Sequence, residues 1–189
     1  RDYVVADKSN GVRYTLLLCR IGKENLSFLV DRKLSFFQVP VASSKRAFAG
    51  SIFDGELVWM RNAHGGQSQL FLVFDVMAYK GSRDIQTRNL HQRLELIRCA
   101  FDLDGRAVDS PEGAAEAAKA GKIVCGGNLH GLSFRAKPCF PLDQIDTLLR
   151  HMTMLPYPTD GLVFSPVHAN VCTGTAEDTF KLKDSHTVD

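Results

Sequence analysis

The chain has 189 residues, of which 44% are hydrophobic and 23% are charged, and its formal net charge is +2. These values are typical of a globular protein with one core, and they exclude a disordered chain or a strongly basic nucleic-acid-binding protein. Any contact with RNA must therefore depend on a local patch of basic residues, such as Lys45 and Arg46 or the stretch 83–93. No run of 18 apolar residues and no signal peptide is present, so we expect no membrane segment.

The cysteines and histidines give no metal-binding pattern. Five cysteines stand at positions 19, 99, 125, 139 and 172, and no two have the spacing of metal ligands. Four of them lie in or beside apolar runs, so we expect reduced core residues of an intracellular protein. The histidines are scattered and none pairs with a cysteine at a zinc spacing, which predicts no structural metal site.

Short runs of β-branched and aromatic residues, separated by turn residues, predict strands in the first part of the chain. The predicted strands are 14–21, 26–31, 36–39, 52–60 and 70–79. A polar, glycine-containing loop is expected at 62–67. This spacing favours antiparallel meanders over a parallel sheet built from βαβ units.

Helical periodicity follows. Leu90, Leu94, Ile97 and Phe101 recur at the spacing of one helix face. A second helix is expected from Pro111, after Ser110, to position 120, before Gly121. A third is marked by the apolar residues Leu142, Ile145, Leu149 and Met152. Further strands are expected at 132–138, 162–167 and 179–182. Strands and helices without regular alternation indicate an α+β fold, and we expect one domain over 1–189.

Six short motifs occur one after another along the chain. They are Lys8-Ser9-Asn10-Gly11-Val12-Arg13, Asp31-Arg32, Asp54-Gly55-Glu56-Leu57-Val58, Phe74-Asp75, Asp160-Gly161-Leu162-Val163-Phe164 and Phe180-Lys181-Leu182-Lys183. A lysine amine can attack the α-phosphorus of a nucleoside triphosphate, provided that desolvation or nearby cations favour its neutral form. Phosphoryl transfer depends on the positioning of the phosphates and the neutralisation of their negative charge. A site for this reaction therefore needs cationic side chains that contact the phosphates.

Together these motifs resemble the covalent lysyl-nucleotidyltransferases, which include DNA and RNA ligases, and among them the mRNA capping guanylyltransferases. The resemblance runs from Lys8 to Lys183. The Asp31-Arg32 step, the strand Phe134-Arg135-Ala136-Lys137-Pro138 and the aspartate at position 160 favour the capping branch, since ligases more often carry Glu at that last position. The resemblance implies an adenylation-type domain whose antiparallel sheets are flanked by helices, with a nucleotide cleft between them.

The resemblance also implies roles for single residues. Lys8 matches the nucleophile, and Arg13 and Glu56 match ribose-binding positions. Arg32 is a further phosphate or ribose contact, and Lys181 and Lys183 match a phosphate-binding pair.

Three more positions concern the base and the metal. Phe74 matches the aromatic residue that stacks on guanine, and Lys137 matches a donor to guanine O6. Asp160 matches an acidic position near the phosphates, where it is a candidate ligand for Mg²⁺ or Mn²⁺.

The chain departs from the family pattern in three places. Asn10 stands where the family usually has aspartate, and Leu182 stands where the family usually has an aromatic residue. No oligonucleotide-binding domain follows in this chain, so we expect a piece of a longer protein.

The implied activity is that of an mRNA guanylyltransferase, which forms lysyl-GMP from GTP and transfers GMP to the 5′-diphosphate end of RNA. Two alternatives stay open: an ATP-dependent polynucleotide ligase, and a non-catalytic module that binds GTP or RNA. The resemblance further implies RNA triphosphatase or methyltransferase domains or partners. It implies an intracellular location: the nucleus for a cellular protein, and the cytoplasm or virion for a viral one.

Overall fold

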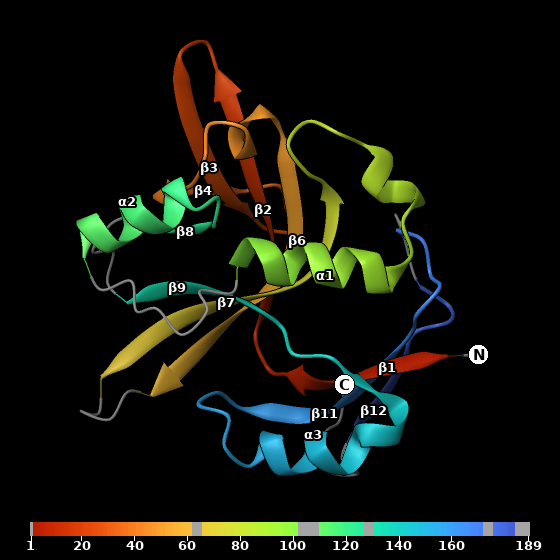
Figure 1. Cartoon of the computed structure of the whole chain (residues 1–189). Helices are drawn as coiled ribbons and strands as arrows, with labels where there is room; N and C mark the ends of the chain where they lie inside the picture. Colours follow the sequence, from red (N-terminus) through yellow and green to blue (C-terminus); the bar gives the residue numbers. More distant parts are fainter. Residues whose placement is uncertain (1, 62–65, 102–109, 127–130, 172–175, 184–189) are drawn as a thin grey trace.

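Two β-sheets, joined by the chain that runs from β1 into β2, form the frame of the protein (Figure 1). The computed structural model describes residues 2–61, 66–101, 110–126, 131–171 and 176–183. Within these residues, a six-stranded sheet has the order β4-β3-β2-β6-β7-β9, a four-stranded sheet has the order β10-β1-β11-β12, and β5 pairs with β8.

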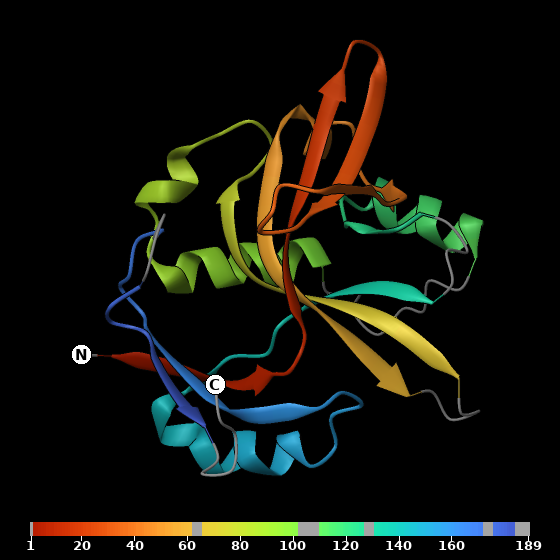
Figure 2. The ribbon, with the colours of Figure 1, turned by 180° about the vertical axis from the view of Figure 1, so that it is seen from behind.

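The larger sheet confirms the strands predicted in the first part of the chain. It contains β2 (Val12–Ile21), β3 (Glu24–Val30), β4 (Phe36–Gln38), β6 (Ser51–Arg61), β7 (Gln67–Ala78) and β9 (Leu132–Ala136). Neighbours from β4 to β7 are antiparallel, as expected. Figure 2 shows the β2–β3 hairpin, which rises beyond the other strands. Most of the loop predicted at 62–67 lies outside the described residues.

One pair of strands differs from the antiparallel expectation. β9 runs parallel to β7, with Phe71 opposite Phe134. A parallel pair needs a long crossover, and here the crossover contains α1 (Leu90–Phe101), α2 (Pro111–Lys119) and β8 (Val124–Cys125). The meander therefore ends at β7, where the chain switches to one βαβ unit. β5 (Val41–Ala42) is the antiparallel partner of β8.

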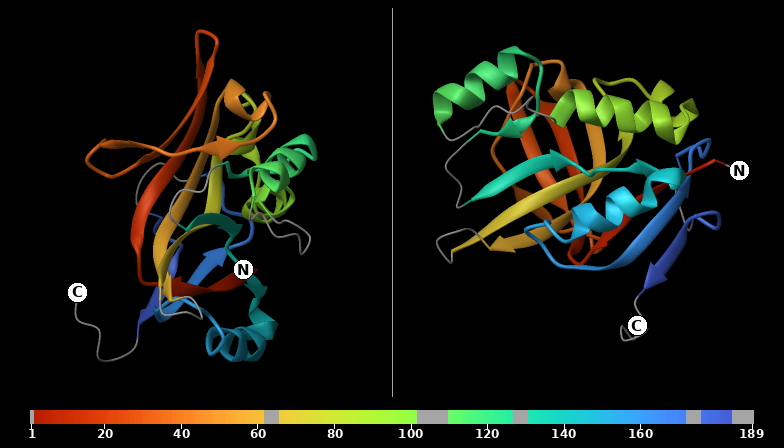
Figure 3. Two further views of the ribbon diagram at one scale, coloured as in Figure 1. Left: turned by 90° about the vertical axis from the view of Figure 1, so that its left-hand side faces the viewer. Right: turned by 60° about the horizontal axis from the view of Figure 1, so that its bottom comes forward.

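The smaller sheet carries the two ends of the described chain. Its strands are β1 (Tyr3–Ser9), β10 (Phe140–Pro141), β11 (Thr159–Pro166) and β12 (Phe180–Lys183). The strands β11 and β12 confirm predictions, whereas β1 was not predicted because its apolar run is only four residues long. The helix α3 (Ile145–Met152) lies against this sheet, on the side away from the larger sheet (Figure 3).

The helices lie at the predicted positions. Short 3₁₀ turns stand at Ala47–Ala49, Asp84–Thr87 and Leu142–Gln144. In α3 the buried leucine is Leu148, while Leu142 and Leu149 are exposed. The third helix is thus confirmed, and its buried leucine is a neighbour of Leu149, one of the residues that marked it. In α2, Ser110 caps the helix by accepting a hydrogen bond from the Gly113 amide.

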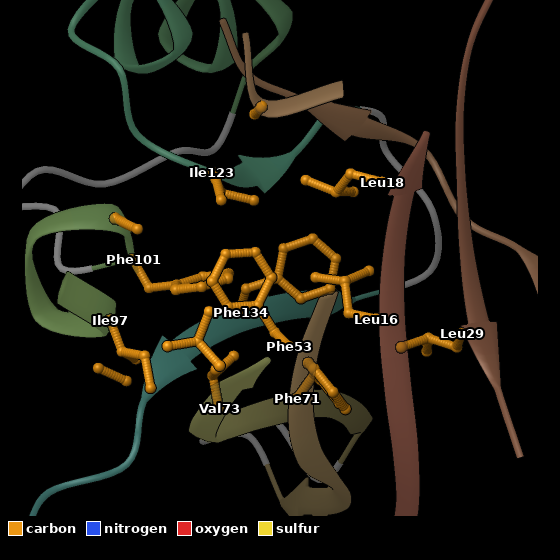
Figure 4. Packing of buried hydrophobic residues seen from close by; sticks show 14 of the residues in the cluster. Leu16, Leu18, Leu29, Phe53, Phe71, Val73, Ile97, Phe101, Ile123 and Phe134 are labelled. Carbon is orange, nitrogen blue, oxygen red and sulfur yellow. The ribbon is translucent and has the colours of Figure 1, made fainter. Parts of the chain in front are cut away.

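The main core lies between the larger sheet and α1 (Figure 4). Phe53 of β6 is fully buried, and its ring meets Phe101 of α1 edge-to-face at 4.9 Å between centroids. β7 is buried on both faces because its side chains alternate: Phe71 and Val73 enter this core, while Leu70 and Leu72 pack with Val58 and Tyr157 on the other side. β7, the longest strand described, is thus packed against one hydrophobic cluster on each of its faces.

The cysteines are less buried than expected. Cys19 and Cys139 are half-buried free thiols and Cys99 is an exposed one. The prediction of core cysteines was wrong for Cys99, which lies on the solvent side of α1, two residues before the buried Phe101. Cys172 lies outside the described residues.

Replacing Phe53 tests whether this core holds the fold together. Phe53→Ala removes a fully buried ring, and we expect the free energy of unfolding to fall by about 3–5 kcal/mol. Ile21→Ala, at an exposed position at the end of β2, is the control and is expected to change it by less than about 0.5 kcal/mol. Urea denaturation followed by circular dichroism measures both values, and equal effects would contradict the assignment of Phe53 to the core.

Thiol labelling tests the placement of two cysteines. Burial raises the pKa of the Cys139 thiol to about 12, so it holds almost no reactive thiolate at pH 8. We expect iodoacetamide to modify Cys99 at least about tenfold faster than Cys139 in the native protein. Peptide mass spectrometry over a time course measures both rates, and a denatured sample in which the two rates converge is the control. Equal native rates would contradict the burial of Cys139.

Candidate active site

A cleft of about 700 Å³ lies where the two sheets and α1 meet. Its wall includes seven of the residues singled out from the sequence, which come from five strands and two connecting segments: Lys8, Arg13, Arg32, Glu56, Phe74, Lys137 and Lys181. Asp160 contacts Lys8 in the wall, whereas Lys183 is not among the described residues that line the cleft. Residues from both ends of the sequence are therefore brought to one surface.

Lys8, in the wall of the cleft, forms an ion pair with Asp160. The Lys8 Nζ donates to both Asp160 carboxylate oxygens at 2.6 Å. In the β1–β11 pairing, Asp7 lies opposite Leu162 and Ser9 opposite Thr159, so two residues of β11 face the single residue Lys8. Such a bulge changes the direction of side chains locally, and here it leaves Asp160 beside the lysine amine.

The second residue of the bulge, Gly161, brings β12 close to Lys8. Its φ is 142°, and an added Cβ would lie 1.9 Å from the carbonyl oxygen of Leu182. A side chain at this position would push β12 away. Lys181 pairs with Val163 and Lys183 with Gly161, so both lysines lie on the strand next to Asp160. Their spacing of two residues puts them on the same face.

Glu56 fastens the Lys8 strand to the larger sheet. Its carboxylate accepts hydrogen bonds from the Ser9 hydroxyl and from the Gly11 amide, the latter at 3.2 Å. An added Cβ on Gly11 would lie 2.4 Å from the Leu57 carbonyl oxygen, so only glycine allows this approach. Asn10 is exposed, and its backbone amide donates a hydrogen bond to the Pro158 carbonyl at 3.0 Å. The backbone around Asn10 is therefore held without an aspartate side chain.

Arg13 is a fixed cation above Phe74. Its Nε donates a hydrogen bond to one Asp54 carboxylate oxygen at 3.0 Å, and a second guanidinium nitrogen donates to the other oxygen. The guanidinium carbon lies 5.8 Å from the centroid of the Phe74 ring. The hydrogen bond to Asp54 is the main cause that raises the pKa of Arg13 above its ordinary value. Arg13 is half-exposed on the cleft side, so an anionic ligand can reach it.

Arg32 reaches the cleft from a rigid turn. The Asp31 carboxylate accepts hydrogen bonds from the Ser35 and Lys33 amides, both at 2.8 Å. These hydrogen bonds, led by that of Ser35, lower the pKa of Asp31 below its usual range. The Asp-Arg step therefore has a local explanation: the aspartate closes the turn and the arginine is left pointing to the cleft.

Arg93 is a site residue that sequence reasoning missed. It is 2% exposed, donates to both oxygens of Asp75 at 2.7 and 3.2 Å, and donates to the carbonyls of Arg88 and Ala169 at 2.7 Å. It thereby ties β7 and α1 to the segment that follows β11. The available signal was a charged residue between Leu90 and Ile97, on the predicted apolar face of the helix.

Asp7 was also missed, and it changes the surroundings of Lys137. The Lys137 Nζ donates to the Ser9 hydroxyl at 2.7 Å and lies 3.5 Å from the Asp7 carboxylate. The other Asp7 oxygen accepts from the Tyr157 hydroxyl at 3.4 Å. Both charges are buried. Lys137 therefore enters the cleft as a paired cation, and an acidic residue that ends the apolar run 3–6 was the available signal.

Two further observations concern metal binding and membrane-spanning helices. Within the described residues, no group of three histidine, cysteine or acidic side chains is arranged to hold a metal ion. None of the helices in the described part of the chain has the length and apolar character needed to cross a bilayer.

Comparison with known proteins agrees with the resemblance found in the sequence. The chain is similar to mRNA-capping enzyme subunit alpha of Neurospora crassa (34% identity over 49% of this chain and 26% of the relative). It is also similar to the proteins of that name from Kluyveromyces lactis (26% identity, 97% of this chain and 40% of the relative) and Eremothecium gossypii (26%, 100% and 42%). The chain thus spans about two-fifths or less of the length of these relatives.

A solved chain from work on Lig E DNA ligases aligns with 96% of this chain and 62% of its own length, at 15% identity and a TM-score of 0.48. The family model described as "mRNA capping enzyme, catalytic domain" matches residues 1–185, which include every motif from Lys8 to Lys183. The chain therefore belongs to the family of mRNA capping enzyme catalytic domains.

Proposed function

We propose that this chain is an mRNA guanylyltransferase domain, in which Lys8 attacks GTP. The observation that carries the proposal is the position of Lys8: its amine lies in the wall of a cleft of about 700 Å³ that also presents Arg13, Arg32 and Lys181. Membership in the capping enzyme family and the similarity to capping enzyme alpha subunits support the same activity. A surface lysine outside a cleft would have no such surroundings.

The first step is the formation of lysyl-GMP. The Lys8 Nζ gives up a proton, for which the Asp160 carboxylate at 2.6 Å is within reach. The neutral amine attacks the α-phosphorus, an N–P bond forms, and the P–O bond to the β-phosphate breaks, so pyrophosphate leaves with the electron pair. Arg13, Arg32 and Lys181 contribute by neutralising the phosphate charge. Lys183 joins them as a second phosphate contact on β12.

The second step transfers GMP to RNA. A terminal oxygen of a 5′-diphosphate RNA end attacks the α-phosphorus of lysyl-GMP, a P–O bond forms, and the N–P bond to Lys8 breaks. The amine takes back a proton and the enzyme is regenerated. The relatives are named as alpha subunits, which fits an association with a separate RNA triphosphatase or methyltransferase.

The proposed base pocket combines stacking with a charged donor. Phe74 offers a ring face to the base and Glu56 offers acceptor oxygens to the ribose hydroxyls, with Arg13 beside them. Lys137 offers only donors, so it favours guanine O6 and disfavours the amino group that adenine carries at that place.

The donor set near Lys8 fits a divalent ion bound mainly by the substrate. Asp160 offers one carboxylate, and Mg²⁺ is commonly held by one or two carboxylates together with phosphate oxygens and water. Asp160 would hold Mg²⁺ or Mn²⁺, which would supply neutralisation of phosphate charge when bound.

Substitution of the nucleophile is the first test. GTP labelled at the α-phosphate is incubated with the chain and Mg²⁺, and the protein is run on a denaturing gel. We expect a labelled band in the unmodified chain and its loss in Lys8→Ala, because the proposed nucleophilic amine is removed. Lys23→Ala, at an exposed lysine on the β2–β3 turn, is the control and should keep the label. Label from ATP but not from GTP would favour a polynucleotide ligase, and no label from either would favour a binding module.

Base selection is the second test. A hydrogen bond to a charged group is worth roughly 1.5–3 kcal/mol, so Lys137→Ala should lower the preference for GTP over ATP by about ten-fold or more. Phe74→Ala should weaken the use of both nucleotides similarly, because every base has a ring face. Rates of adduct formation with each nucleotide give the ratio, at a temperature where circular dichroism shows a folded protein. An unchanged ratio in Lys137→Ala would place base selection elsewhere.

A further inference from the structure

Behind the cleft, a buried carboxylate faces the buried lysine. Asp7 is 0% exposed and Lys137 is 8% exposed, and their charged atoms lie 3.5 Å apart. The Asp7 oxygen on that side, Oδ2, accepts no hydrogen bond from the described residues, so its partner is the ammonium charge itself. Asp7 does not line the cleft, whereas Lys137 does. The carboxylate therefore acts on the lysine and not on a ligand.

Burial works against the positive charge of Lys137, and the Asp7 carboxylate offsets this effect. Transfer of an ammonium group into a poorly solvated place favours the uncharged amine, and a nearby carboxylate reverses that preference. The charged and the neutral form of the lysine side chain differ in the hydrogen bonds that they can make with a base. The ammonium has three donors and no acceptor, whereas the neutral amine has a lone pair that accepts hydrogen bonds. A neutral Lys137 would therefore tolerate the amino group of adenine as well as the O6 of guanine.

We propose that Asp7 is a positioning residue for base selection, because it keeps Lys137 charged and thereby limits it to an acceptor on the purine edge. The proposal rests on the proposed function, in which Lys137 reads the base. It assigns a role to the residue that directly precedes Lys8 in sequence but faces away from it. Along β1, Asp7 and Ser9 lie on one face and Lys8 on the other.

The other groups around Lys137 are compatible with this role. The Ser9 hydroxyl accepts a hydrogen bond from the Lys137 ammonium and donates one to the Glu56 carboxylate, so it also orients the lysine. Burial raises the pKa of the Tyr157 phenol above its ordinary value and that of the Cys139 thiol to about 12, so neither loses its proton near neutral pH. Further charges in the surroundings are those of Glu56, Asp75 and Arg135.

The test is Asp7→Asn, which keeps the size of the side chain and removes its charge. Binding of the α,β-methylene analogues of GTP and ATP is measured by calorimetry, because these analogues cannot release pyrophosphate and the readout does not need adduct formation. We expect the preference for the guanine analogue to fall by about ten-fold relative to the unmodified chain, measured at the same neutral pH.

Two variants separate charge from structure. Tyr157→Phe removes the hydrogen bond to Asp7 but not the carboxylate, and it should keep the ratio of the unmodified chain. Asp7→Glu keeps the charge and should restore most of the preference. If Asp7→Asn does not fold, Asp7→Ser is measured with the same expectation. Failure of both to fold would overturn the proposal, because Asp7 would then be required for the fold alone.

The outcomes distinguish this inference from the proposed function. An unchanged ratio in a folded Asp7→Asn would overturn the role of Asp7, and it would leave the labelling of Lys8 by GTP unaffected. Loss of labelling in the unmodified chain would contradict the proposed guanylyltransferase. A shifted ratio in Asp7→Asn would then still support the role of Asp7 in reading the base. If neither analogue binds to the unmodified chain, both are overturned.

Discussion

The ion pair between Lys8 and Asp160 is the contact on which the rest of the cleft depends. It joins residues 152 positions apart, and its geometry comes from one bulge in the β1–β11 pairing. Because side chains alternate along β1, the residues on either side of Lys8 face the opposite way, toward Lys137 and Glu56. Three successive residues thus fix the smaller sheet, the β9–β10 connection and the larger sheet to each other.

The ion pairs in the wall of the cleft fix the positions of side chains more than they add to the stability of the protein. Each of several cations in the wall has its own carboxylate: Lys8 with Asp160, Arg13 with Asp54, Arg93 with Asp75 and Lys137 with Asp7. Taking both charges of a pair out of water costs nearly as much as their attraction returns. Their contribution is positional, since removing either partner leaves an uncompensated charge. The pairs hold four side chains in place before any ligand arrives.

The sequence predicted the motifs and the longer elements except β1, but not the contacts between the elements. Runs of β-branched and aromatic residues predicted the strands of the larger sheet, including β4, whose residues are exposed. The parallel pairing of β9 was not visible, since Leu132–Ala136 has the same pattern in either direction. The motifs predicted Lys8 and Lys137 as site residues, but not Asp7 or Arg93. Asp7 pairs with Lys137 and Arg93 pairs with Asp75, and the spacing of residues along the chain does not reveal which side chains the fold brings together.

The proposed roles of the two lysines make opposite demands on their charge, and the structure treats the two ion pairs differently. Lys8 must lose its proton to attack phosphorus, whereas Lys137 must keep its proton to select an acceptor. The partner of Lys8 is an aspartate whose side chain is 18% exposed beside the cleft, within reach of incoming phosphates. The partner of Lys137 is fully buried behind it. The phosphates of a ligand can therefore approach the carboxylate that pairs with Lys8, whereas the carboxylate that pairs with Lys137 stays out of reach behind the cleft.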